Sequence, residues 1–126
     1  MSDKRLEVLK SMGDHYGDLY KRVHYLFVGN GAGFAGGLTF LKEYSSDPRF
    51  HGIGVPIALF GVGLIAAVAN YITLAAAQMN AKNSVMDGAQ HGPSMPVFYI
   101  HYGSLVVSGL AFLIAVGVII YRVVAF

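Results

Sequence analysis

Residues 29–37 read Gly-Asn-Gly-Ala-Gly-Phe-Ala-Gly-Gly, and the interpretation of this run decides the class of the whole chain. Residues 31–36 spell GxGxxG directly after the strand-like residues 25–28, a pattern typical of a dinucleotide-binding turn. Residues 29–37 as a whole also spell GxxxGxxxG, the spacing on which membrane helices pack closely. The two interpretations exclude each other, because one needs a soluble α/β sheet and the other a helix in lipid.

A dinucleotide site requires a helix after the last glycine and, about 20 residues further on, an acidic side chain that binds the ribose. Only residues 38–44 separate Gly37 from the turn Ser45-Ser46-Asp47-Pro48. Asp47 is the acid nearest to the required distance, and it leads into a long apolar run rather than following a second strand. The sequence therefore predicts no nucleotide binding here and favours the membrane helix.

Composition supports the same choice. The chain has 126 residues, of which 55% are hydrophobic and 13% charged, whereas a soluble domain carries about 25% charged residues. No Lys, Arg, Asp or Glu occurs in residues 50–81 or in residues 88–121. Each gap exceeds the roughly 20 apolar residues that cross a bilayer as a helix. We therefore expect an all-α integral membrane protein with a single domain over residues 1–126.

Three transmembrane helices are expected, at residues 23–41, 55–79 and 97–121. An amphipathic helix over residues 4–22 precedes the first span and is expected to continue into it without a break. Its apolar side chains recur in alternating steps of three and four, as in a heptad, at Leu9, Met12, Tyr16, Leu19, Val23 and Leu26. Such a face would suit a helix that lies on the membrane surface or one that pairs with another helix, and the mixed charges of this segment favour pairing.

The distribution of Lys and Arg predicts the orientation. Six lie on the side of the N-terminus, namely Lys4, Arg5, Lys10, Lys21, Arg22 and Lys82, and three on the other, namely Lys42, Arg49 and Arg122. The N-terminus is therefore expected in the cytoplasm and the C-terminus outside. Residues 80–96 are expected to form a turn-rich cytoplasmic connector, or a docking site for a partner protein.

Each predicted span carries a seam of small residues. The three seams are Gly29, Gly33 and Gly37; Gly63, Ala66, Asn70, Thr73 and Ala77; and Ser104, Ser108, Ala111 and Ala115. Because lipid is as apolar as leucine, small residues gain nothing by facing it, but they let helices approach closely. Three such seams exceed the needs of one small bundle, so we expect a homo-oligomer.

Asn30, Asn70 and Ser108 lie at similar depths in this topology and form a polar layer, with Thr73 and Ser104 nearby. One interpretation is that these side chains hydrogen-bond one another and fix the register of the helices. The other is that in an oligomer they surround a water-filled path.

With no grouped acid, base, nucleophile or metal ligands, the chain is not expected to be an enzyme. The predicted activity is a pore or channel, for example in a membrane-permeabilising effector.

His24 and His101 are expected in the same leaflet, within reach of one another. Paired histidines on facing helices hold haem b in membrane cytochromes, and a single histidine can relay protons, although many interfacial histidines only anchor a helix. No other cofactor or metal is expected, since cysteine is absent, and a net charge of +2 gives no reason to expect nucleic acid. The alternative function is an accessory or haem-binding subunit of a larger membrane complex.

Residues 30–41 read Asn-Gly-Ala-Gly-Phe-Ala-Gly-Gly-Leu-Thr-Phe-Leu, and the second span contains Ala66-Ala67-Val68-Ala69-Asn70-Tyr71 and ends near Gln78. Over this half of the chain the sequence resembles small three-span bacterial inner-membrane proteins, which carry an Asn-Gly-Gly-Ala-type first helix and mostly have no assigned role. This chain has Gly31-Ala32 where that pattern has a glycine pair before alanine. The resemblance implies a bacterial inner membrane, with the C-terminus in the periplasm, and says little about activity.

Overall fold

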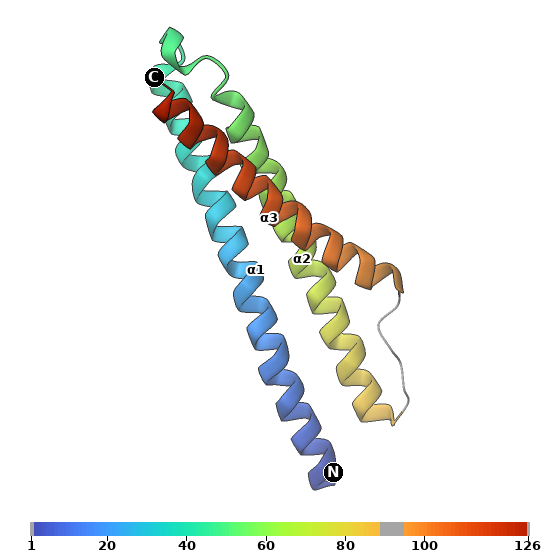
Figure 1. Cartoon of the computed structure of the whole chain (residues 1–126). Coiled ribbons are helices and arrows are strands. Elements are labelled where there is room, and N and C mark those ends of the chain that lie inside the picture. The colour runs from blue at the N-terminus through green and yellow to red at the C-terminus, as the bar shows by residue number, and fades with distance from the viewer. Residues whose placement is uncertain (1, 89–94, 126) are drawn as a thin grey trace.

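The computed structural model describes residues 2–88 and 95–125, and within them every regular element is helical. The elements are α1 (Asp3–Tyr44), the short 3-10 helix η1 (Pro48–Phe50), α2 (Gly54–Asp87) and α3 (Met95–Val124). Helices α1 and α2 run antiparallel, while α3 crosses α2 at an angle and returns to the end of the molecule where α1 ends (Figure 1). The predicted all-α class is confirmed.

Helix α1 is unbroken over 42 residues, which at about 1.5 Å per residue makes it roughly 63 Å long. The segments predicted at 4–22 and 23–41 are thus parts of one helix. In residues 3–20 the partly buried side chains are Leu9, Met12, Tyr16, Leu19 and Tyr20, and the others are exposed. This face pairs with α2, since the ring of Tyr20 stacks on that of Tyr71 with centroids 6.2 Å apart. Pairing with another helix is therefore the arrangement found.

Helix α2 extends further than the sequence suggested. It continues through residues 80–87, so the turn-rich connector expected to begin at Asn80 is wrong over this part. The physical reason is that neither glycine nor proline interrupts residues 80–87, and Gly88 then ends the helix in the left-handed conformation at φ 67°. The predicted connector is also wrong at Met95 and Pro96, which already belong to α3, and residues 89–94 lie outside the described residues. We call residues 3–22 of α1 and 80–87 of α2 together the stalk.

Two helices in the described part of the chain are long and apolar enough to cross a membrane, namely α2 and the segment Pro96–Val124 of α3. This supports the second and third predicted spans. Helix α1 is not among the helices that qualify, because its uncharged run at 23–41 is rich in glycine and contains His24 and Asn30. The first span therefore stays a prediction.

The three predicted seams meet inside one bundle. A Cβ added to Gly29 would lie 3.0 Å from the ring of Phe112, and one on Gly33 would lie 2.6 Å from the ring of Phe60. A Cβ on Gly37 would lie 2.6 Å from Ile57 Cγ1. The seam residues buried on the other two helices are Gly63, Ala66, Asn70, Thr73, Ser108, Ala111 and Ala115. Because the small residues named here are packed or buried within one chain, they give no reason to expect a homo-oligomer.

Candidate functional site

Asn30 of α1, Ser108 of α3 and Gly63 of α2 join the three helices at one level. The Asn30 Nδ2 atom donates to Ser108 Oγ at 3.2 Å and to the Leu26 carbonyl, one turn earlier, at 2.9 Å. Ser108 Oγ in turn donates to the Gly63 carbonyl at 2.8 Å. Asn30 and Ser108 are completely buried. These hydrogen bonds fix the axial register of all three helices.

Gly63 is what lets α1 and α2 approach this closely. The place where a Cβ would lie is occupied by the Asn30 carboxamide, whose Oδ1 and Cγ atoms are the nearest to it. Oδ1 is buried and has no hydrogen-bond partner among the described residues. The Cα–H bond that a Cβ would replace points toward this oxygen, which is the arrangement of a weak Cα–H···O contact. A side chain at position 63 would therefore displace the amide.

A second polar cluster joins α2 to α3 through Asn70 and His101. In the amide orientation that gives partners to both ends, Asn70 Nδ2 donates to His101 Nδ1 at 2.9 Å, and Oδ1 accepts from the Leu105 N–H at 2.9 Å. Thr73 Oγ1 lies 3.4 Å from the same ring nitrogen and donates to the Ala69 carbonyl at 3.0 Å. Because Nδ1 accepts from the amide, the neutral imidazole carries its proton on Nε2.

His24 reaches α2 by a different contact, because its Nδ1 atom lies 3.1 Å from the Tyr71 hydroxyl. Residues 70 and 73 face α3, whereas Tyr71 faces α1, so the two histidines lie at the same level on different sides of α2. Among the described residues no hydrogen bond or ring contact joins the two histidines. A haem held between them would have to span both sides of α2.

The residues predicted to line a water-filled path lie inside a single protomer. Asn30, Asn70 and Ser108 are 0% exposed and Thr73 is 9% exposed. Ser104 turns its hydroxyl back to its own helix and donates to the Ile100 carbonyl at 2.6 Å. Since these groups bond to neighbouring helices or to their own backbone, the structure favours the register-fixing interpretation of the polar layer. Tyr71 could not be identified from the sequence as a partner of His24, because a single tyrosine within an apolar run does not indicate which side chain it contacts.

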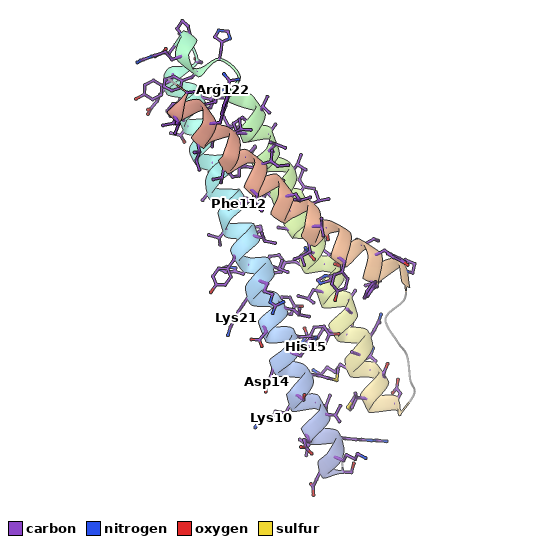
Figure 2. All side chains as sticks on the ribbon, in the orientation of Figure 1. Lys10, Asp14, His15, Lys21, Phe112 and Arg122 are labelled. Carbon is purple, nitrogen blue, oxygen red and sulfur yellow. The ribbon has the colours of Figure 1, made fainter. Side chains whose placement is uncertain are left out.

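An apolar groove opens at the end of the bundle opposite the stalk, where α1, α3 and the α1–α2 connection meet. Its volume is about 620 Å³. The apolar walls include Gly33, Gly36, Gly37 and Phe40 of α1, Ile57 and Phe60 of α2, and Ile119 and Val123 of α3. Arg49, His51 and Arg122 add polar groups. Figure 2 shows Arg122 at the end opposite the stalk residues Lys10 and Asp14. Glycines predicted only to pack helices thus also form a wall of this groove.

The two arginines of the groove differ in their partners. Arg49 Nη2 lies 2.7 Å from Asp47 Oδ2, and the side-chain hydrogen bond from Arg49 holds the pKa of the Asp47 carboxyl below its usual value. Asp47 also caps η1 by accepting from the Arg49 backbone N–H at 3.0 Å. Arg122 Nη1 donates to the His51 carbonyl at 2.9 Å, and no carboxylate of the described residues pairs with it. The Arg49 guanidinium is therefore paired with a carboxylate, whereas that of Arg122 has no such partner in residues 2–88 and 95–125.

Comparison with protein-family models, with curated proteins and with solved structures found no match to this chain. The roles of these residues therefore rest on the contacts described above.

Proposed function

We propose that the protein is an accessory subunit of a larger membrane complex, in which a closed three-helix bundle anchors a stalk that binds a partner protein. The observation that supports this best is that the polar layer is buried, and the glycines of α1 are packed against α2 and α3, within a single chain. A bundle closed in this way has no polar path through itself. What extends from it is the stalk, in which the start of α1 lies beside the end of α2.

The outer surface of α3 supports insertion in a bilayer. Only 17% of the most apolar part of Pro96–Val124 is buried within the protein. The exposed positions of one face recur in steps of three and four, at Gly103, Val106, Leu110, Leu113, Gly117, Ile120 and Val124. A continuous apolar face of this length is unfavourable in water, whereas lipid covers it without loss.

Helix α1 is proposed as the third span because of its contacts. Asn30 bonds to Ser108, in the middle of Pro96–Val124, and Gly33 packs against Phe60 of α2. If α2 and α3 cross the bilayer, this part of α1 lies at the same depth. Its low hydropathy is tolerable there, because a helix satisfies its backbone hydrogen bonds internally and the glycines face neighbouring helices.

The stalk is proposed to lie in the bacterial cytoplasm, since most Lys and Arg residues lie on its side of the bundle. Its tip exposes Leu6 and Met86, whose side chains are 54% and 55% exposed. The two helix ends are adjacent, because a Cβ on Gly88 would lie 3.5 Å from Arg5 Nη2. Large apolar side chains exposed where two adjacent helix ends meet favour a protein partner at this site.

Photo-crosslinking in cells tests this assignment. A crosslinking amino acid replaces Leu6 or Met86 at the tip, and, as the control, Leu113 on the outer face of α3. We expect both tip positions to give an adduct with the same protein and position 113 to give no such adduct. Tip positions that give no discrete adduct, in a protein that also purifies without a partner, would contradict the proposal.

Two other functions predict different results for the same purified protein. A homo-oligomeric pore would conduct ions across planar bilayers and would have the mass of several identical chains. A haem subunit would show a Soret absorbance that is lost in His24→Ala or His101→Ala. An accessory subunit with neither property would instead retain a different protein at fixed stoichiometry in native mass spectrometry.

A further inference from the structure

We propose that the apolar groove beside Arg122 binds one anionic phospholipid, with an acyl chain in the groove and the phosphate at the guanidinium. This lipid site is independent of any partner at the stalk. It requires only that α2 and α3 cross the bilayer, which places the groove and its mouth against lipid.

The groove has the shape and chemistry for a chain. Its volume of about 620 Å³ lies within the range of about 300–1,000 Å³ found for small-molecule sites. It follows α1 from Gly33 to Phe40, which is roughly 10 Å of helix at about 1.5 Å per residue. A Cβ on Gly36 would meet nothing within 4 Å, so no protein side chain fills the space beside that residue. An acyl chain can enter without displacing any side chain there.

The mouth of the groove offers an oriented cation. Arg122 Nη1 donates to the His51 carbonyl at 2.9 Å, which holds the guanidinium at the groove. Gly52 makes room for it, since a Cβ there would lie 2.8 Å from Arg122 Nη2. Arg49, by contrast, is occupied by Asp47 at 2.7 Å. The planar guanidinium of Arg122 can use its other N–H groups to bind a phosphate, which arginine does with two parallel hydrogen bonds.

The depth of these groups matches the layers of a bilayer. Arg122 directly follows the charge-free residues 96–121, so it lies where the apolar span ends. The rings of Phe40, Tyr44 and Phe50 pack together at this level, with centroid distances of 4.7, 4.8 and 5.6 Å. Aromatic side chains gather at membrane interfaces. An apolar groove with a cation at its interfacial end matches a phospholipid, which has apolar chains and an anionic headgroup. A second copy would present residues 50–81 or 88–121, which contain no Asp or Glu, and would leave the charge of Arg122 unmatched.

Native mass spectrometry of the delipidated protein tests the headgroup. The protein is titrated with phosphatidylglycerol or phosphatidylcholine at equal concentrations. We expect one phosphatidylglycerol to be retained in preference to phosphatidylcholine, and Arg122→Gln to weaken its retention roughly fivefold, as expected for one basic side chain near anionic lipid. Lys42→Gln is the matched control, because it removes a positive charge near the same end but outside the groove. Equal loss in both variants, or no preference for the anionic lipid, would overturn the proposal.

A second pair of variants tests the chain in the groove. Gly36→Leu places a side chain in the open groove, and Gly117→Leu adds the same side chain at an exposed position of α3 that also has no neighbour within 4 Å. We expect Gly36→Leu to abolish lipid retention and Gly117→Leu to preserve it, with unchanged helical circular dichroism in both. Unaltered retention in Gly36→Leu would place the lipid elsewhere. A dimer that is lost in Gly36→Leu would assign the groove to a second copy instead.

Discussion

Asn30 shows at the scale of one residue how this bundle is specified. Its depth in the membrane could be predicted from the sequence. Counting residues inward from the cytoplasmic end of each predicted span places Asn30, Asn70 and Ser108 in one layer. Its partners could not be predicted, since heptad spacing gives the face of a helix but not its rotation against two others. The hydrogen bond from Asn30 to Ser108 and the close contact with Gly63 depend on that rotation.

Gly63→Ala is the sharpest test at this scale. The new methyl group would occupy the place of the Asn30 amide, which also bonds to Ser108. Overpacking of this kind costs about 1–3 kcal/mol, so the free energy of unfolding should fall by about that amount. Gly109→Ala is the control, because a Cβ there meets nothing within 4 Å and alanine favours a helix. Unfolding in mixed micelles, followed by circular dichroism, gives both values, and equal effects would contradict the tight contact.

Helix boundaries show at the scale of the element what periodicity can and cannot predict. The continuity of α1 followed from a seam that runs from Leu9 to Leu26. The extension of α2 to Asp87 was not foreseen, because the apolar run ends near residue 79. The helix continues there since α1 lies beside it, and Ala81, Ser84 and Val85 are only partly exposed. The absence of glycine and proline from residues 80–87 allows this extension, contact with α1 supports it, and Gly88 ends it. The local sequence does not reveal the neighbouring helix.

Gly13 and Gly17 test whether the first half of α1 is a continuous helix in the native state. Both lie within α1, and a Cβ at either position would meet nothing within 4 Å. Gly13→Ala and Gly17→Ala should each raise the free energy of unfolding by about 0.4–1 kcal/mol, because alanine loses less backbone entropy on folding. Amide hydrogen exchange over residues 4–22 should slow in parallel. Unchanged or faster exchange would show that this half of the chain is bent or frayed at the glycines.

At the scale of the whole molecule, the composition predicts a membrane protein, and the number of helices follows from the gaps between charges. The sequence could not show which small-residue faces would be used internally. Gly33 and Gly37 pack against α2, and Ser108 bonds to both other helices. The prediction of an oligomer and a pore assumed that some small-residue seams would have no partner within one chain. In the described bundle the polar layer is instead enclosed by a single chain, and the outer face of α3 and the tip of the stalk stay exposed.

Water accessibility of the polar layer tests this central claim most directly. The chain has no cysteine, so Ser108→Cys provides a single thiol in the layer, and Lys82→Cys provides a matched thiol on the exposed stalk. In native membranes we expect a membrane-permeant but polar maleimide to label position 82 and to spare position 108 until the protein is denatured. Labelling of position 108 at a rate like that of position 82 would show water in the layer, and the closed bundle would be contradicted.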